Sequence, residues 1–302
     1  MIPLSLGWVM LVMLVPTYYG DTLGIGLGVA GTVIAVGRVF DIGTDFVTGW
    51  LSDRFRYSRL GRKFWITIGL PLFCTAFALL LLPPPNSGPF YLAIVSLFYF
   101  FSYTLVEIPH SAIGLELSDN NATRNSLAAS KSLFLVGGGL LGAALPSVLG
   151  GPSVTAFGYL VAICVCLSLV ILPLFLLLVP ADKKGATPAL PKIRDTIRFV
   201  RQNKPLLVLL AVFLLVQTGS AFIGSFSFPY AAHVLGLPEK TGIFWLAAGV
   251  GFLFGVPVWL LVMNRLGRVL AWSLSLGLML PVFIGLMMLG TGTPNKKPTP
   301  AA

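Results

Sequence analysis

Charged residues are scarce in this chain of 302 residues. Asp, Glu, Lys and Arg together make up 10% of the sequence, whereas hydrophobic residues make up 56%. A soluble domain carries about 25% charged residues, so this sequence lacks the polar side chains that a surface in water requires. Apolar runs of about 20 residues recur along the chain, without the short alternating strands of outer-membrane barrels. The composition therefore predicts an all-α polytopic membrane protein.

Residues and motifs that carry enzyme chemistry are also scarce. The chain has 3 cysteines and 2 histidines, and no zinc-protease, nucleophile-elbow or P-loop motif. Cys74, Cys164 and Cys166 lie in apolar runs, where packing is the expected role. The G-x-G-x-x-G stretch from Gly26 to Gly31 leads into an apolar run and follows no strand, so it does not indicate a nucleotide site. We expect no enzyme activity and no cofactor.

Positive charge alternates between the loops of the chain. The formal net charge of +10 would suggest a nucleic-acid partner in a soluble protein. Here the loops after the second, fourth, sixth and eighth apolar runs hold most of the Lys and Arg residues. Cytoplasmic loops of membrane proteins carry such an excess. We therefore expect no nucleic-acid partner and a multi-pass protein of the cell (inner) membrane, with its N-terminus in the cytoplasm.

Nine apolar runs are long enough to predict membrane spans. They cover residues 3–20, 24–51, 65–83, 89–116, 127–149, 154–179, 205–230, 241–263 and 268–290. The expected organisation is a six-helix N-terminal bundle over 1–179, a cytoplasmic linker over 180–204, a partial C-terminal bundle over 205–290 and a polar tail over 291–302. In the linker, Ile193, Ile197 and Val200 recur at helical spacing, with arginines on another face, which predicts an amphipathic interfacial helix.

The second apolar run keeps three charges where a lipid-facing helix would have none. Arg38, Asp41 and Asp45 are spaced i, i+3, i+7 and share one helix face. A charge at mid-membrane costs about 2.5–3.5 kcal/mol on insertion scales, so a proton, a cation or a basic side chain must offset the second acid. One interpretation is an ion site that faces a wet cavity. The other is an Arg–Asp pair that holds two helices together.

The fourth and fifth runs add further polar residues. Tyr103, Glu107 and His110 share a face of the fourth run, and Pro109 removes a backbone donor beside them. They would suit a cation or a sugar hydroxyl, although a hydrogen-bonded acid and histidine in a packing interface are alternatives. Lys131 in the fifth run either reaches the acids or extends to the interface. Farther along this run, the spacings Gly138-xxx-Gly142 and Gly139-xxx-Ala143 predict close helix packing.

Two stretches of the sequence resemble one family of transporters. "RVFDIGTDFVTGWLSDRFRYSRLGRKFW" resembles the second span and following loop of the glycoside–pentoside–hexuronide:cation symporters, a melibiose-permease-like branch of the major facilitator superfamily. "YTLVEIPHSAIGLELSDNNATRNSLAASKS" resembles the fourth span of that family and the loop after it. The resemblance implies a major-facilitator-type helical bundle with a complete N-terminal six-helix half and about three helices of the second half. It thus also implies a C-terminally truncated chain.

The resemblance also implies roles for individual residues. Asp41 and Asp45 match the two carboxylates of the coupling-cation site, with Thr44 beside them, and the metal would be sodium there if the ion is not a proton. The residues expected to bind solute are Glu107, Tyr103, His110, Lys131 and Arg38. The residues matching the cytoplasmic gating loop are Asp53, Arg54, Arg56, Arg59, Arg62 and Lys63. The opening "MIPLSLGW" lacks the acid that sugar-transporting relatives carry in the first span.

The sequence therefore predicts a cation-coupled secondary transporter, a symporter of a sugar or a similar small hydrophilic solute that works by alternating access. Its coupling ion is expected to be Na⁺ or H⁺, with Na⁺ favoured because two acids and Thr44 lie close together. The expected partners are the lipid bilayer, the solute and a chain that supplies the missing helices. Two other functions stay open, namely a truncated non-transporting relative (a scaffold or inactive fragment) and a transporter of an amphiphile or lipid.

Overall fold

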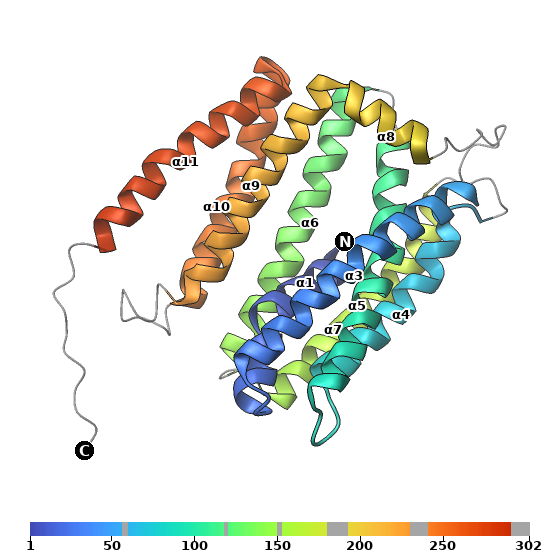
Figure 1. Ribbon diagram of the computed structural model, residues 1–302, viewed down its shortest axis with the longest axis vertical. Helices are drawn as coiled ribbons and strands as arrows, with labels where there is room; N and C mark the ends of the chain where they lie inside the picture. Colours follow the sequence, from blue (N-terminus) through green and yellow to red (C-terminus); the bar gives the residue numbers. More distant parts are fainter. Residues whose placement is uncertain (56–59, 118–119, 150–152, 180–192, 230–240, 291–302) are drawn as a thin grey trace. The chain divides into compact units, whose positions relative to one another are not determined.

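The computed structural model describes residues 1–55, 60–117, 120–149, 153–179, 193–229 and 241–290. Within these ranges the chain is helical and has no β-strand (Figure 1). The helices are α1 Ile2–Met13, α2 Val15–Thr17, η1 Tyr18–Thr22, α3 Leu27–Arg54, α4 Lys63–Leu81, α5 Pro89–Glu116, α6 Asn121–Val148, α7 Val154–Leu178, α8 Ile193–Gln202, α9 Lys204–Pro229, α10 Thr241–Leu266 and α11 Arg268–Gly290. The expected all-α polytopic membrane fold is confirmed.

Each predicted span coincides with a helical segment. Among the described residues, 6 helices are long and apolar enough to cross a membrane, or 7 if the bent segment at the N-terminus is one span. That segment joins Ile2–Val12 to Val15–Thr22 at 43°. Pro16 lies in the first turn after the break and cannot donate to the carbonyl of Val12. The described apolar parts of α9 and α11 are shorter, so the count of nine spans stays a prediction.

Local sequence signals set where several helices begin. Pro89 occupies the first turn of α5, where its missing N–H costs nothing. The Asn120 side chain accepts a hydrogen bond from the Ala122 N–H at 2.9 Å and so caps α6. The Ser153 hydroxyl accepts from the Ala156 N–H at 3.2 Å and caps α7. A side-chain cap of this kind is typically worth about 1 kcal/mol.

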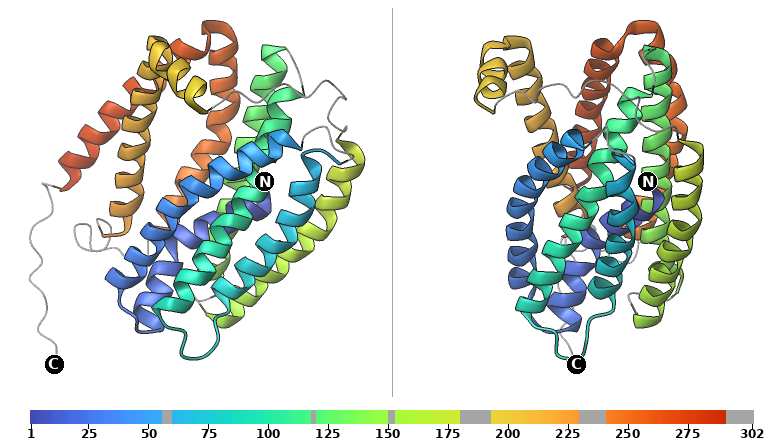
Figure 2. Two further views of the ribbon diagram at one scale, coloured as in Figure 1. Left: turned by 45° about the vertical axis from the view of Figure 1, so that its right-hand side comes forward. Right: turned by 90° about the vertical axis from the view of Figure 1, so that its right-hand side faces the viewer.

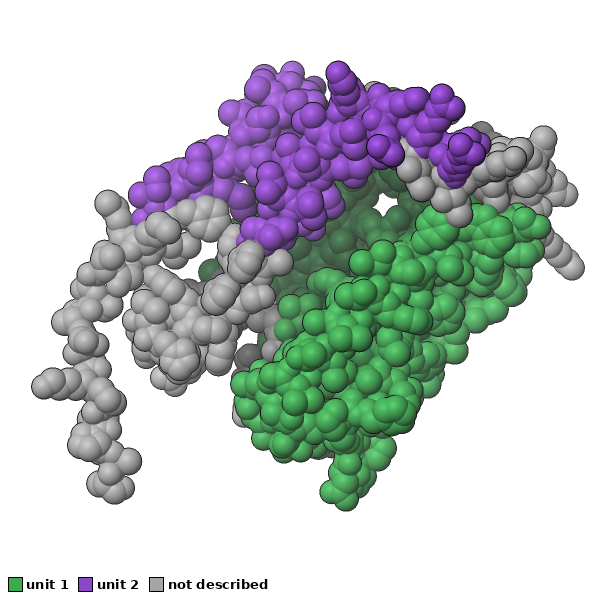
Figure 3. Space-filling view, viewed as in Figure 1, with its two compact units in different colours: residues 1–188, 246–260 green, residues 189–245, 261–302 purple. Residues whose placement is uncertain are grey.

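The chain forms two compact units (Figure 3). The first comprises Met1–Pro188 and Leu246–Leu260, and the second comprises Ala189–Trp245 and Leu261–Ala302. In the first unit, α4 packs against α5 and α7, α5 also packs against α3, and α1 packs against α6 (Figures 1 and 2). In the second unit, α8 contacts α9. The division at residues 179 and 204 expected from the sequence stays a prediction.

Aromatic side chains fill the core of the first unit. Phe73 and Phe77 on α4, Tyr99 on α5 and Phe157 on α7 are each 1% exposed or less. The Phe73 and Phe77 rings stack at 6.1 Å, and Phe73 lies 5.3 Å from the Tyr99 ring. Tyr18 contacts Phe157 edge-to-face at 4.8 Å. These contacts join α4 to α5 and η1 to α7.

Glycines let α1 and α6 approach closely, as the small-residue pattern predicts. A Cβ at Gly138 would overlap Ser5 Oγ and the Ile2 carbonyl of α1, and one at Gly142 would lie 3.1 Å from the Leu6 carbonyl oxygen. The backbones of the two helices can therefore meet only because these positions have no side chain. The prediction of close helix packing at Gly138 and Gly142 is confirmed.

Candidate functional site

The three charges of α3 lie where this helix packs against α5. Arg38 Nη1 donates to Asp41 Oδ2 at 3.0 Å. The Asp41 residue is buried, whereas Asp45, one turn farther along, is exposed. The predicted Arg38–Asp41 pair is thus formed within one helix, and no described ion pair joins Arg38 to Asp45. Among the described residues, Asp45 therefore has no basic side chain in ion-pair contact.

Thr104 on α5 bridges the two carboxylates. Its hydroxyl oxygen lies 3.0 Å from Asp41 Oδ1 and 2.9 Å from Asp45 Oδ1. Thr104 itself is 2% exposed. A hydroxyl has a single hydrogen and can donate to only one of the two acids at a time. At the acid that does not receive this hydrogen, a lone pair of the Thr104 oxygen faces a carboxylate oxygen. That contact is repulsive unless a proton or a cation lies between the two oxygens.

Thr104 was missed in the sequence, although a signal was available. It precedes Glu107 by three residues and so falls on the same face of α5 as the acid that the sequence singles out. Thr44, which the sequence does single out, donates to the Asp41 backbone carbonyl at 2.9 Å and lies 3.4 Å from Asp41 Oδ1. In the described part of the chain, Thr44 thus hydrogen-bonds to Asp41 and not to Asp45, whereas the Thr104 hydroxyl reaches both acids.

Two aromatic rings hold the Arg38 guanidinium. Its Cζ lies 3.8 Å from the centre of the Trp8 ring on α1 and 4.5 Å from the centre of the Phe100 ring on α5. Cation–π contacts of this kind are worth about 0.5–2 kcal/mol each. Gly37 lies beside this contact, since a Cβ there would come 2.7 Å from the Phe100 ring. Arg38 is therefore fixed by α1 and α5 as well as by Asp41.

A second polar cluster joins α5 to α6. Lys131 Nζ donates to Glu107 Oε1 at 2.7 Å and to Ser111 Oγ at 2.6 Å. The Ser111 hydroxyl donates to Glu107 Oε1 at 2.9 Å. The side chains of Lys131 and Glu107 are 31% and 26% exposed, so the pair is only partly buried. Lys131 reaches the acid on α5, which is the first of the two roles that its sequence position left open.

Tyr103 and His110 lie on α5 as expected, but they have different neighbours. The Tyr103 ring is 5.7 Å from the Trp8 ring and 6.3 Å from the Tyr99 ring, so it belongs to the aromatic wall beside Arg38. The His110 ring stacks on Phe175 of α7 at 6.0 Å, and its buried Nδ1 has no hydrogen-bond partner among the described residues. The structure thus brings Tyr103 near Arg38 and Trp8, whereas His110 contacts α7.

The loop between α3 and α4 is tied to two helix ends by one arginine. Arg62 Nη2 donates to Asp53 Oδ1 at 2.7 Å, and Arg62 Nη1 lies 2.8 Å from Glu116 Oε2. The Arg62 side chain is 3% exposed. Burial lowers the pKa of the guanidinium, but hydrogen bonds to Glu116 and Asp53 outweigh burial and raise the pKa above its ordinary value. Glu116, at the end of α5, was not predicted as a partner.

Lys63 has a different role from the neighbouring basic residues. It is 8% exposed, and its Nζ donates to the carbonyl oxygens of Leu176 at 3.1 Å and Val179 at 2.5 Å. These carbonyls lie at the C-terminal end of α7, where helical partners run out. In particular, residue 180 is a proline with no N–H to offer Leu176. Lys63 therefore caps α7 with a positive charge at the negative end of the helix dipole.

Arg54, another residue of the predicted gating loop, forms neither a clamp nor a cap among the described contacts. Arg54 is exposed, and its Cζ lies 5.3 Å from the centre of the Trp50 ring. Arg56 and Arg59 lie outside the described residues. The loop thus contributes one buried clamp, Arg62 with Asp53 and Glu116, and one helix cap, Lys63.

The donor set around α3 and α5 decides which ions could bind there. Two carboxylates and a hydroxyl are hard oxygen ligands, which suit a hard cation or a proton. In the described part of the chain, no three His, Cys, Asp or Glu side chains come together as a transition-metal site would need. Thr104 with Asp41 and Asp45 is therefore suited to a hard cation or a proton.

Known proteins of the same kind are membrane transporters. Residues 1–300 match the family described as MFS/sugar transport protein. The inner membrane symporter YicJ of Escherichia coli (strain K12) is 28% identical over 249 residues, which is 79% of this chain and 53% of YicJ. The putative glycoside/cation symporter YagG of the same organism is 25% identical over 279 residues, or 88% of this chain and 60% of YagG.

A vertebrate transporter is also similar. The sodium-dependent lysophosphatidylcholine symporter 1 of Mus musculus is 22% identical over 298 residues, which is 84% of this chain and 55% of the mouse protein. The chain thus spans about half the length of the curated relatives it matches. The family and these relatives are transporters and not enzymes. Since the family match covers nearly all of the chain, this multi-pass membrane protein belongs to the MFS/sugar transport protein family, with the glycoside/cation symporters among its relatives.

Proposed function

We propose that this chain carries the cation site and part of the solute site of a cation-coupled symporter. The observation that supports this proposal most directly is the position of Thr104, whose single hydroxyl faces both Asp41 and Asp45 at 3.0 and 2.9 Å. Two acids that share one hydroxyl repel each other less when a positive ion is present. A bound cation would thus draw α3 and α5 together at this point.

The coupling ion is proposed to be sodium, with a proton as the alternative. Sodium would take oxygen ligands from Asp41, Asp45 and Thr104, and the Arg38 guanidinium would keep neutralising the other oxygen of Asp41. A proton would need only one of the two acids. Some relatives of this chain are described as sodium-dependent, which agrees with the larger ion.

The solute is proposed to bind at the half-buried cluster of Glu107, Lys131 and Ser111, beside the aromatic wall of Tyr103 and Trp8. Hydroxyl groups of a sugar can accept from Lys131 and donate to Glu107, while an aromatic face packs against the apolar face of a sugar ring. Glu107 lies on the same face of α5 as Thr104, so a cation that shifts α5 would also shift the solute ligands. This common helix would couple the two sites.

Alternating access would rock one helix bundle against the other around the site. The clamp formed by Arg62 with Asp53 and Glu116 joins the ends of α3 and α5 and would keep these two helices together in that movement. We place this loop and the N-terminus on the cytoplasmic side of the inner membrane, because the basic loops alternate along the chain.

Cation binding can be tested without assuming a solute. The purified chain in lipid nanodiscs should bind sodium in a calorimetric titration, with an affinity that falls as protons compete at lower pH. The variant Asp45→Asn should lose this binding and remain folded, because Asp45 is exposed and has no ion-pair partner among the described residues. Sodium binding that is unchanged in Asp45→Asn would overturn the proposed site. Binding of protons without binding of sodium would identify the proton as the coupling ion.

The second function, transport of an amphiphile, has one supporting observation. A sodium-dependent lysophosphatidylcholine symporter matches 84% of this chain. Binding of a labelled sugar panel and of labelled lysophosphatidylcholine should be compared with and without sodium. Sodium-dependent binding that needs Glu107 and occurs only with sugars would support the hydrophilic solute, whereas sodium-dependent binding of the lipid alone would support the amphiphile.

A further inference from the structure

The second unit carries a basic surface that takes no part in the cation or solute site. It consists of Arg194, Arg198 and Arg201 on α8 and Lys204 at the start of α9, and we refer to it as the α8 basic face. The three arginines are spaced i, i+4, i+7 and therefore share one side of the helix. All four side chains are exposed. Within the described residues, none of them makes a hydrogen bond or an ion pair.

A fixed turn joins this surface to α9, the helix of the seventh predicted span. The Asn203 N–H donates to the Phe199 carbonyl at 3.1 Å and continues α8, while Asn203 Oδ1 accepts from the Leu206 N–H at 3.2 Å and caps α9. One residue thus ends one helix and begins the next, and Figure 1 shows the chain turning sharply between them. The described part of α9 exposes apolar side chains such as Phe213 and Leu214, as expected of a helix in lipid.

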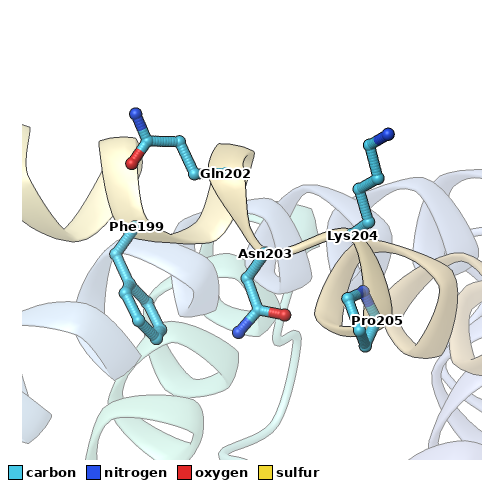
Figure 4. A pocket seen from close by; sticks show the side chains of 5 residues that line it. All are labelled: Phe199, Gln202, Asn203, Lys204 and Pro205. Carbon is cyan, nitrogen blue, oxygen red and sulfur yellow. The ribbon is translucent and has the colours of Figure 1, made fainter.

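The turn has a polar side and an apolar side. An open hollow of about 570 Å³ lies around it, lined by Phe199, Gln202, Asn203, Lys204 and Pro205. Figure 4 shows Gln202 and Lys204 pointing to one side of the chain, whereas Phe199, Asn203 and Pro205 point to the other. The Phe199 ring is 63% exposed, so it is available for contact with an apolar environment such as a lipid bilayer. This arrangement resembles a helix that lies in the membrane–water interface.

We propose that the α8 basic face binds the headgroups of anionic phospholipids. Guanidinium groups recognise phosphodiesters through two parallel hydrogen bonds, and four unpaired positive charges favour a lipid with net negative charge over a zwitterionic one. Only one acid, Asp195, lies between residues 193 and 205 to oppose them. The exposed Phe199 ring would lie at the boundary of the acyl chains. The occupant is a lipid and not a soluble phosphate, because α9 joins this surface to an apolar helix with exposed side chains such as Phe213 and Leu214, the seventh predicted span.

Native mass spectrometry of the purified full chain tests this proposal. The protein in detergent is mixed with equimolar dioleoylphosphatidylglycerol and dioleoylphosphatidylcholine. The detergent is then removed in the mass spectrometer, and the adducts of each lipid are counted. We expect phosphatidylglycerol adducts to dominate, and we expect R194Q/R198Q/R201Q to reduce that preference by roughly tenfold or more. Because these arginines are exposed and unpaired in the described structure, the variant should keep the thermal unfolding temperature of the parent chain.

A charge-matched control makes the result specific. The variant R265Q/K296Q/K297Q removes the same number of positive charges elsewhere in the chain and should keep the preference for phosphatidylglycerol. An equal loss in both triple variants would reduce the effect to overall charge and overturn the proposal. Displacement of phosphatidylglycerol by millimolar inorganic phosphate would also overturn it, since the site would then bind a soluble anion. Retained adducts in the presence of phosphate would support a lipid site.

Discussion

The Thr104 hydroxyl on α5 lies 2.9 Å from Asp45 Oδ1 on α3, across 59 positions of the sequence. The same oxygen lies 3.0 Å from Asp41 Oδ1. Each acid by itself could serve as a packing group with a hydrogen bond. Together, around one hydroxyl, they form a small oxygen-lined site between α3 and α5. The chain itself belongs to a family of transporters. The predictions below test this site and the contacts that support it.

Removing the Thr104 hydroxyl should weaken cation binding while leaving the fold intact. Thr104→Val keeps the shape of the side chain and removes the donor and lone pairs. A hydrogen bond to a charged group is worth about 1.5–3 kcal/mol, so the sodium affinity measured by calorimetry should fall by at least about tenfold. Thr104→Ser keeps the hydroxyl and should bind sodium nearly as the parent does. Equal affinities in the valine and serine variants would contradict a role for this hydroxyl.

The two acids should differ in their effect on stability although both are needed for cation binding. Asp41→Asn removes the partner of Arg38, whose position is also fixed by Trp8 and Phe100. The stranded guanidinium should lower the free energy of unfolding by about 1–3 kcal/mol. Asp45→Asn should leave stability nearly unchanged. Thermal unfolding followed by tryptophan fluorescence measures both.

A double variant supplies the control for this difference. Arg38→Gln combined with Asp41→Asn leaves no uncompensated charge and should recover much of the stability that Asp41→Asn loses. Sodium binding should remain absent in the double variant. A double variant as unstable as the single one would show that Asp41 stabilises the helix packing by contacts other than the ion pair.

Arg62 should be more important for stability than Arg54, which is exposed. Its two guanidinium nitrogens contact acids on two helices, so Arg62→Lys should not restore both contacts. The double variant D53N/E116Q leaves the buried guanidinium without its acids and should destabilise the protein by about 3–5 kcal/mol. Arg54→Gln, at an exposed position, is the matched control and should be nearly neutral. A stable D53N/E116Q variant would argue against the clamp.

Adding one methyl group between α1 and α6 should be costly. Gly138→Ala would drive a Cβ into Ser5 and Ile2, and overpacking of this kind costs about 1–3 kcal/mol. The adjacent Gly137 has open space at the same position, so Gly137→Ala should be neutral or stabilising by up to about 1 kcal/mol. Equal melting temperatures for the two alanine variants would show that the helices do not approach as closely as these contacts require.

The orientation of the chain can be tested with reporter fusions. Fusions after Arg59 and Arg194 should report the cytoplasmic side, because the loops that contain them are rich in Lys and Arg. A fusion after Pro84 should report the outer side. The opposite result at any two of these three positions would reverse the proposed orientation of the N-terminus.

The helices of this protein could be predicted from the sequence because membrane spans depend on local composition. Lipid leaves no partner for a free backbone N–H, so an apolar run of sufficient length becomes a helix wherever it lies in the chain. The face shared by Arg38, Asp41 and Asp45 also followed from spacing alone, as did the amphipathic α8. The small residues at Gly138 and Gly142 predicted a close helix contact, but the sequence did not say that α1 would be the partner.

The pairing of side chains from distant segments depended on the tertiary structure. The packing of α3 against α5 decides that Thr104 bridges two acids, and that Trp8 and Phe100 enclose Arg38. The packing of α4 against α5 and α7 decides that Arg62, at the start of α4, contacts Glu116. It also decides that Lys63 caps α7. The sequence determined which residues are charged and on which helix face they lie, because helical periodicity is a local property. Only the tertiary structure decided which faces meet, because that choice depends on how whole helices fit together.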